Sequence, residues 1–350
     1  MSWPRYLRTL LLTTLVCVLA TYAWILLVDA YDTVWFSPPL EREPIGKNQR
    51  FSYPALARNP GFDSLILGTS SIRLLNPQEL NPMLDASFAN LAMNASTPYE
   101  QSQILALFVR HHPKIRYLLH GVDDFWCNPN DPISQFANRP FPAWMYDENR
   151  WNDLLYLFNS ATLKQTWRQF RNQLGLRTPM QGSDGHTVFV PPESRYDLKK
   201  VRGKIYGDDP PHLKPAVEPP LEVSQGQRSS WTFPNLELLG EMLKSLPADT
   251  TKVLILPPYH QFHLPAPGSL AAAQHIECKE RLTRLAAEVP NTSLIDFMFR
   301  SPITLEDENY WDPEHYRVGI ASLIGESVVD AIKSGREREG VNRMLLRPGG

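Results

Sequence analysis

The chain has 350 residues, enough for one large domain or two domains of ordinary size. Its 35 Lys and Arg residues nearly balance its 37 Asp and Glu residues, so the formal net charge is only -2. No basic block stands out along the chain, and the sequence therefore argues against a nucleic-acid partner.

The N-terminus predicts a membrane anchor. Residues 9–28 contain no charged side chain and consist mostly of Leu, Val, Ala, Thr and Ile. A helix of this length spans a bilayer at about 1.5 Å per residue. Arg5 and Arg8 precede the run, and Asp29 and Asp32 follow it. The positive-inside rule then predicts a cytoplasmic N-terminus and an extracytoplasmic chain beyond about residue 29, held by a single pass through the membrane.

A cleaved signal peptide is the alternative interpretation of this run. The tripeptide Thr21-Tyr22-Ala23 could serve as a cleavage site. Apolar residues continue through Trp24-Ile25-Leu26-Leu27, which favours an uncleaved anchor.

Beyond the anchor, changes in composition predict three further segments. Prolines and mixed charge predict a tether, a regular β/α pattern predicts one domain with a Pro-rich insertion, and a charged end predicts a mobile tail. The predicted organisation has five parts: a cytoplasmic segment (1–8), a transmembrane helix (9–28), a tether (29–59), one domain (60–332) with an insertion at about 125–230, and a mobile tail (333–350).

Hydrophobic patterning within the domain predicts strands that alternate with helices. Short apolar runs stopped by Gly or Pro predict strands at 64–68, 87–92, 115–119, 252–256 and 292–297. Helical periodicity predicts an irregular helix at 71–84 and regular helices at 99–109, 151–174, 234–246, 270–289 and 316–332.

This alternation predicts an α/β fold: a three-layer, mostly parallel sheet with helices on both faces, plus a helical and loop-rich insertion. In such sheets the ligand crevice lies at the carboxyl ends of the strands. Four segments are expected at that edge: Gly68-Thr69-Ser70, 120–124, 257–263 and the loop before Asp312.

Two of these segments carry the residues of a nucleophilic triad. A serine on a strand-to-helix turn can attack a carbonyl if a histidine takes its proton and a carboxylate orients the histidine. Ser70 is the candidate nucleophile, His315 the base and Asp312 its orienting group. Ser70 and Ser71 could instead cap a helix without any chemistry. Asp312 could likewise cap the last helix, with His315 in its first turn.

The chain resembles the SGNH, or GDSL-like, serine hydrolases, over about residues 60–125 and 250–332. More closely, it resembles membrane-anchored relatives that act in alginate O-acetylation and teichoic-acid D-alanylation. The family's Gly-Asp-Ser motif is present as Gly68-Thr69-Ser70, and its Asp-x-x-His motif is intact as Asp312-Pro313-Glu314-His315. The resemblance implies the same catalytic roles for Ser70, His315 and Asp312.

The middle motifs of the family are altered. Ala95 stands where a glycine usually supplies an oxyanion-hole N–H, and a left-handed backbone there would cost an alanine energy. The family's Gly-x-Asn-Asp is present as Gly121-Val122-Asp123-Asp124, and an ionised Asp123 would repel an oxyanion. Either Asp123 is protonated, or it serves another role and Asn94 helps instead. The candidate oxyanion or substrate-binding residues are Ser71, Asn94, Ala95, Asp123 and His260.

Three further features leave alternatives open. His260-x-x-His263 has a spacing that metal ligands can use, but the preceding prolines predict a loop that either contacts substrate or lies on the surface. Cys127 and Cys278 could pair in an oxidising compartment. The aromatic residues of the insertion are either local core or a glycan-stacking platform: Phe125, Trp126, Trp144, Tyr146 and Trp151. No metal site or cofactor is predicted.

The function implied is serine-dependent acyl-ester chemistry, by an O-acyltransferase or esterase, on a cell-envelope polysaccharide or lipid-linked glycan. The expected partners are this glycan, an acyl donor, the membrane and a membrane-bound acyltransferase. The alternative is a catalytically silent protein of the same fold that binds glycan or acts as a scaffold in an envelope assembly.

Overall fold

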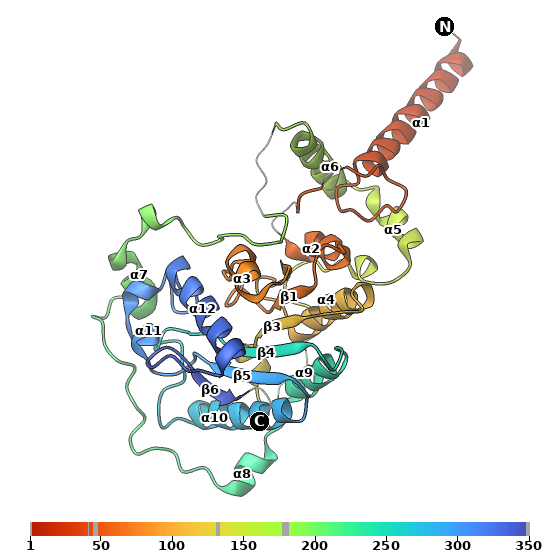
Figure 1. Cartoon of the computed structure of the whole chain (residues 1–350). Helices are drawn as coiled ribbons and strands as arrows, with labels where there is room; N and C mark the ends of the chain where they lie inside the picture. Colours follow the sequence, from red (N-terminus) through yellow and green to blue (C-terminus); the bar gives the residue numbers. More distant parts are fainter. Residues whose placement is uncertain (1, 41, 45–47, 131–133, 177–181, 348–350) are drawn as a thin grey trace. The chain divides into compact units, whose positions relative to one another are not determined.

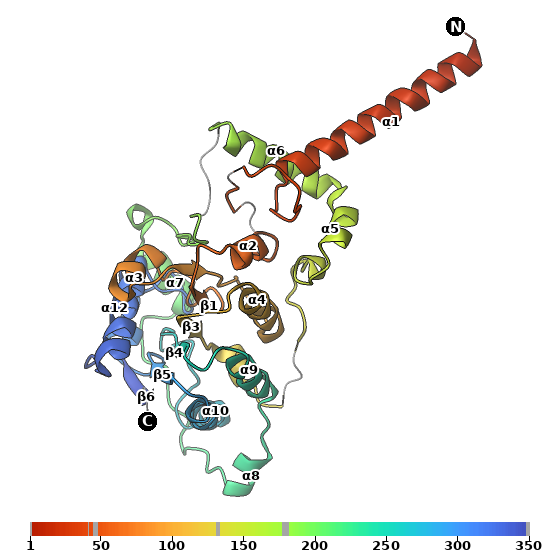
Figure 2. The same cartoon turned by 45° about the vertical axis from the view of Figure 1, so that its right-hand side comes forward.

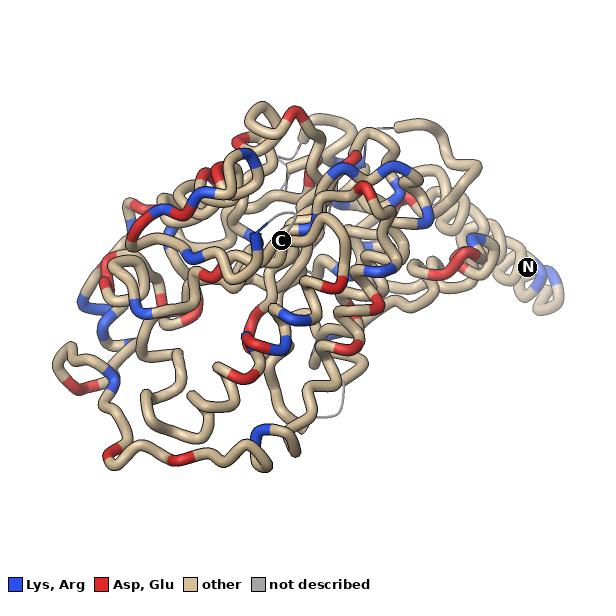
Figure 3. The backbone as a smooth tube through the Cα atoms, turned by 60° about the horizontal axis from the view of Figure 1, so that its bottom comes forward, with Lys and Arg blue, Asp and Glu red and all other residues tan. Residues whose placement is uncertain are grey.

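The computed structural model describes the chain except residues 1, 41, 45–47, 131–133, 177–181 and 348–350 (Figure 1). The chain divides into two compact units. The N-terminal unit contains Met1–Leu56 and Pro140–Ser183, and the sheet unit contains Ala57–Arg139 and Asp184–Gly350. Lys and Arg residues are interspersed with Asp and Glu residues along the backbone (Figure 3).

The sheet unit is built on a six-stranded, mostly parallel sheet with the strand order β2-β1-β3-β4-β5-β6. Only the pairing of β5 with β6 is antiparallel. The order of the first five strands is that of a doubly wound sheet whose direction of winding reverses between β1 and β3. The strands are β1 (Ser64–Leu67), β2 (Phe88–Asn90), β3 (Tyr117–Gly121), β4 (Thr251–Leu256), β5 (Thr292–Asp296) and β6 (Arg343–Leu346).

Helices of the sheet unit pack in two groups. Helix α4 contacts α9 and α9 contacts α10, whereas α12 contacts α3 (Figure 2). The buried side of α12 contributes Ile324 and Val328 to a core that also contains Ile66, Val253 and Ile295 from the strands. The helices are α3 (Pro77–Leu84), α4 (Pro98–His111), α7 (Leu198–Tyr206), α8 (Gln225–Ser230), α9 (Pro234–Lys244), α10 (Leu270–Ala287), α11 (Pro302–Leu305) and α12 (Val318–Ser334), with 3-10 helices η1 (Asp124–Cys127), η3 (Glu193–Arg195) and η4 (Asp307–Asn309).

The N-terminal unit contains the apolar helix α1 (Trp3–Val28), which is long and apolar enough to cross a membrane. Its other helices are α5 (Arg150–Leu157), α6 (Ser160–Gln173), the 3-10 helix η2 (Ala143–Met145) and most of α2 (Gln49–Arg58). The sequence predicts one helix over 151–174, but the structure has two, because the chain bends at Phe158 and Asn159 caps α6.

Three segments differ from the predicted organisation. Residues 140–183, predicted as part of an insertion, group with the N-terminal residues instead of the sheet unit. Part of the predicted tether 29–59 is folded, because the buried carboxylate of Asp29 accepts hydrogen bonds from the backbone N–H groups of Thr33 and Val34, and α2 follows. Part of the predicted mobile tail 333–350 forms β6, which pairs with β5.

Candidate active site

The turn after β1 presents Ser70 at the carboxyl edge of the sheet. Gly68 begins this turn with a φ of 144°. A Cβ atom at Gly68 would lie 2.8 Å from Ile72 Cγ2 and 3.1 Å from the carbonyl oxygen of Gly121 in β3. Glycine therefore allows the turn to pack closely on β3, and it leaves Ser70 half-buried.

The structure brings Ser70, His315 and Asp312 together. The Nε2 atom of His315 lies 2.9 Å from Ser70 Oγ, although the two residues are 245 positions apart. The Nδ1 atom of His315 lies 2.9 Å from Asp312 Oδ1 and 3.1 Å from Oδ2. With its proton on Nδ1, the imidazole donates to Asp312 and accepts from the hydroxyl of Ser70. The contact predicted from sequence is present.

Asp312 is fixed within its own short loop. Its Oδ1 atom accepts hydrogen bonds from the backbone N–H of Glu314 at 3.0 Å and of His315 at 2.9 Å. Burial would raise the pKa of the Asp312 carboxyl, but the hydrogen bonds and the charge attraction of His315 outweigh it and lower the pKa. The lowered pKa favours the carboxylate form of Asp312, which can accept a hydrogen bond from His315 Nδ1.

Two contacts hold the histidine loop against its neighbours. The hydroxyl of Tyr316 donates to the carbonyl oxygen of Ser71 at 2.6 Å, which ties the histidine loop to the serine turn. The backbone N–H of His260 donates to the carbonyl oxygen of Pro313 at 2.9 Å. Residues from three loops thus fix the distance between Ser70 and His315.

Ser71 and Asp123, both predicted to contact substrate, are buried in this structure. The Thr69 hydroxyl donates to Asp123 Oδ2 at 2.6 Å and lies 3.0 Å from Ser71 Oγ. Asp123 also caps η1 by accepting from the backbone N–H of Phe125. Burial and the neighbouring charge of Asp124 raise the pKa of Asp123 to about 7. The buried side chains of Ser71 and Asp123 therefore both contact Thr69 in the serine turn.

Asn94 and Ala95 lie in the turn after β2. Ala95 is exposed and has a φ of 49°, so alanine does occupy the left-handed conformation at this position. The side-chain oxygen of Asn94 accepts a hydrogen bond from Arg73 Nη1 at 3.0 Å.

Arg73 and Phe189 are two residues near the triad that the sequence analysis missed. The Phe189 ring lies edge-on to His315, with ring centroids 5.6 Å apart, and the buried guanidinium of Arg73 lies 5.3 Å from the Phe189 centroid. A single charged residue within the apolar run 72–75 is a signal for Arg73. Phe189 comes from the loop-rich part of the chain, where no pattern singled it out.

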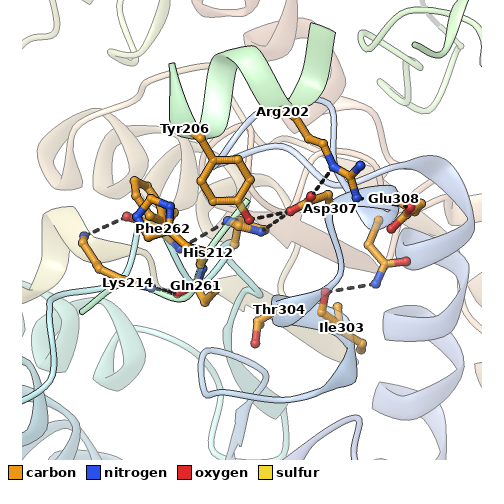
Figure 4. Close-up of polar contacts among 12 residues, drawn as sticks. Arg202, Tyr206, His212, Lys214, Gln261, Phe262, Ile303, Thr304, Asp307 and Glu308 are labelled. Carbon is orange, nitrogen blue, oxygen red and sulfur yellow. Dashed lines mark hydrogen bonds and ion pairs between the residues drawn. The ribbon is translucent and has the colours of Figure 1, made fainter. Parts of the chain in front are cut away.

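His260 occupies a different position from the predicted one. Its side chain is fully buried, and Nε2 lies 3.2 Å from Asp307 Oδ1. Tyr206 Oη donates to the same oxygen at 2.7 Å, and Arg202 Nε donates to Asp307 Oδ2 at 2.7 Å (Figure 4). The expectation that His260 contacts substrate is corrected: it belongs to a buried network that attaches α7 to η4. Asp307 had no sequence signal.

Among the residues that the structure describes, no group of three or more His, Cys, Asp or Glu side chains could hold a metal ion. His263 is paired separately from His260: its Nε2 lies 3.2 Å from Asp124 Oδ2 and its Nδ1 lies 3.7 Å from Glu314 Oε1. Burial would lower the pKa of His263, but these two carboxylates outweigh it and raise the pKa. His263 therefore connects the loop after β3 to the loop that carries His315.

Comparison with protein-family models finds no match for this chain, and comparison with curated proteins finds none either. The geometry of the site is therefore the basis for its interpretation.

A cavity of about 210 Å³ lies beside these loops. Asp124, Tyr259 and His263 line it together with apolar side chains and the first turns of α10. Cys127 and Cys278, whose pairing the sequence left open, form a disulfide that joins η1 to α10 at the wall of the cavity.

Proposed function

We propose that this chain is a membrane-anchored enzyme of acyl-ester chemistry, an O-acyltransferase or esterase that uses Ser70 as its nucleophile. The observation that carries the proposal is the line of contacts from Ser70 through His315 to Asp312. Hydroxyl, imidazole and carboxylate at hydrogen-bond distance form the arrangement that activates a serine.

The proposed reaction has two halves. Ser70 Oγ attacks the acyl carbonyl while His315 Nε2 takes the hydroxyl proton, and a tetrahedral oxyanion forms. The ester bond then breaks, His315 returns the proton to the leaving alcohol, and the acyl group stays on Ser70. Water or a sugar hydroxyl next gives its proton to His315 and attacks the acyl-enzyme. The bond between the acyl carbon and Ser70 Oγ then breaks, and His315 returns the proton to Oγ, which restores the Ser70 hydroxyl. Asp312 stabilises the imidazolium in both halves.

We also propose that the fold is a three-layer SGNH-type fold. The strand order supports this, because the site follows β1 and β3, between which the winding of the sheet reverses. The left-handed Ala95 stands at the position of the family's glycine. The burial of Asp123 beneath the serine turn departs from the family pattern, and we infer that it holds Thr69 instead of contacting the oxyanion.

The proposed substrate is a cell-envelope polysaccharide or a lipid-linked glycan, on the periplasmic side of the inner membrane. An apolar, exposed α1 supports membrane anchoring. The Cys127–Cys278 disulfide supports an oxidising compartment, because disulfides persist there and are rare in the cytosol. A membrane-bound acyltransferase is the proposed source of the acyl group.

A serine-reactive fluorophosphonate probe tests the proposal on the full chain in detergent. We expect labelling of the wild type at Ser70 and none of Ser70→Ala, with thermal stability nearly unchanged. Ser71→Ala is the matched control, and we expect it to keep most of the labelling because the Ser71 hydroxyl lies against Thr69. A wild-type chain that stays unlabelled while it binds glycan would support the silent scaffold instead.

A second experiment separates transfer from hydrolysis. The acyl-enzyme formed from a small activated ester is offered water alone or water with an oligosaccharide acceptor. Acylated oligosaccharide indicates a transferase, and release of free acid at the same rate in both conditions indicates an esterase.

A further inference from the structure

Helix α6 has its polar and apolar sides reversed relative to a helix of a water-soluble protein. The side chains that it buries are polar: Thr162, Thr166 and Gln169. Its exposed side chains include Leu163 and Trp167, and 55% of Trp167 is accessible. In water, burial selects the apolar side of an amphipathic helix. The reversed pattern indicates that the outer side of α6 faces something other than water.

Helix α5 and the bend that follows it extend this surface. Asp153 is buried, whereas 82% of Leu155 is accessible. The exposed aromatic side chains on this part of the chain are Trp151, Tyr156 and Phe158. A monomeric soluble protein rarely exposes so many large apolar side chains side by side. We call the exposed apolar side chains of α5, α6 and the bend between them the collar.

The collar is attached to the last turns of α1. The hydroxyl of Tyr22 donates to the carbonyl oxygen of Leu154 at 2.7 Å, and the Trp24 ring lies 6.2 Å from Trp167 and 6.0 Å from Phe170. Figures 1 and 2 both show α6 beside the carboxyl-terminal end of α1. Tyr22 is six residues before the end of α1 at Val28, or about 9 Å along the axis. The collar therefore lies against α1 near one end of its apolar length.

Basic side chains accompany the apolar ones on α6. Lys164, Arg168 and Arg171 follow one another at helical spacing, next to the stripe of Leu163 and Trp167. Long basic side chains beside an apolar stripe can reach lipid headgroups while their stems lie on apolar surface. Trp and Tyr side chains are enriched at the same depth of a membrane.

We propose that α5 and α6 lie in the boundary between headgroups and acyl chains of the bilayer that α1 spans, and that lipid covers the collar. This inference rests on the proposed membrane anchor, because the depth of the collar in the bilayer is set by its contacts with α1. The exposed apolar side chains are then buried about 5–10 Å into the boundary. The membrane thereby holds the N-terminal unit by two helices at its boundary as well as by one span.

Spin labels on single cysteines test this in the full chain, reconstituted in nanodiscs of phosphatidylethanolamine and phosphatidylglycerol. Cys17 in α1 is the only free cysteine among the described residues, and its label reports the span itself. On a Cys17→Ser background, Leu155→Cys and Leu163→Cys report the collar. Lys164→Cys is the matched control, because it neighbours Leu163 and is also exposed.

The measurement is the collision rate of each label with oxygen, which concentrates in the bilayer, relative to a water-soluble nickel complex. We expect this ratio to be several-fold higher at positions 155 and 163 than at position 164, and highest at position 17. A ratio at 155 and 163 equal to that at 164 would overturn the collar while a high ratio at 17 leaves the anchor intact. A low ratio at 17 would overturn both.

The same labels in native membrane vesicles distinguish lipid from a protein partner. Equal ratios in nanodiscs and native vesicles support lipid as the occupant. Labels at 155 and 163 that are open to the nickel complex in nanodiscs but shielded in native vesicles would overturn the proposal in favour of a membrane protein partner.

Discussion

Two of the His–Asp pairs in the sheet unit differ in the groups that they contact and in their exposure. His315 and Asp312 lie in one loop, are partly exposed, and meet a serine hydroxyl. His260 and Asp307 come from two loops, and His260 is fully enclosed beside Asp307, which a tyrosine hydroxyl and an arginine also contact. One pair thus contacts a serine hydroxyl, as the proposed mechanism requires, and the other connects two loops; the two pairs differ in solvent exposure.

Burial also affects the electrostatics of the His260–Asp307 pair. Burial lowers the pKa of His260, and the attraction of Asp307 opposes this without cancelling it. The lowered pKa favours the neutral imidazole of His260, because a charged imidazole is costly to bury. The carboxylate of Asp307 is balanced instead by Arg202, at the surface end of the network.

The largest effect is expected from His315→Ala. Removing the base should lower turnover of a small acyl ester, and the rate of Ser70 acylation, by a factor on the order of 10⁴ or more. Thermal stability should change little, because the side chain is partly exposed. An assay of activated-ester hydrolysis measures turnover, and a melting curve measures thermal stability. Turnover within about ten-fold of wild type would show that the pair is not catalytic.

His260→Ala should produce the opposite pattern. It removes an enclosed side chain and one partner of Asp307, at a cost of about 2–4 kcal/mol in the free energy of unfolding. Ester turnover by the folded protein should stay within about ten-fold of wild type. Chemical denaturation and an assay normalised to folded protein check both values. Loss of turnover with unchanged stability would show that His260 contributes to catalysis, so that the two pairs would not differ in role.

Asp123→Asn tests the titrating group beneath the serine turn. Because the native pKa is raised from 3.8 to about 7, the folded state keeps a proton that the unfolded state loses. Wild-type stability should therefore fall as pH rises from about 4 to 7, by an amount on the order of 4 kcal/mol, and level off above pH 7. An asparagine removes this slope while its oxygen still caps η1.

The difference between variant and wild type isolates this effect from the other titrating groups, such as Asp312. Urea unfolding at pH 5 and pH 8 measures it, and we expect the variant to gain relative stability at pH 8. A constant difference across this range would show that Asp123 is already ionised in the folded protein.

The smallest effect is expected from Ala95→Gly. Alanine at a φ of 49° carries a conformational cost that glycine avoids, partly offset by the greater freedom of glycine in the unfolded chain. The net gain should be about 0.5–1 kcal/mol, seen as a rise of a few degrees in melting temperature. A fall in melting temperature would mean that the Ala95 methyl group makes a stabilising contact.

The sequence was sufficient for the parts of the site that are encoded locally. Two of the buried strands contain continuous apolar runs, at 65–67 and 253–256, and Asp312 and His315 lie in one four-residue motif. Ser70 was found because it follows such a strand at a glycine. The second pair escaped notice because 47 residues separate His260 from Asp307, and only the folded chain brings them together.

The division into units was also beyond the reach of local patterns. Residues 140–183 join the N-terminal residues through contacts such as Tyr22 with Leu154, which no periodicity in either segment indicates. The reversed polarity of α6 is visible only once its buried side is known. Strand β6 was missed because only its pairing with β5, and not a regular apolar pattern, makes residues 343–346 a strand.

The disulfide would keep the chain together after proteolytic cleavage between Cys127 and Cys278. Cys127 and Cys278 are 151 residues apart, and the peptide between them includes all of the 140–183 excursion into the N-terminal unit. A protease that cuts within the Pro-rich stretch 207–220 would leave two fragments joined by sulfur, with Ser70 on one and His315 on the other. Such a nicked protein should run as one band without reductant and as two with it, and its serine and histidine would stay covalently linked through the same bond.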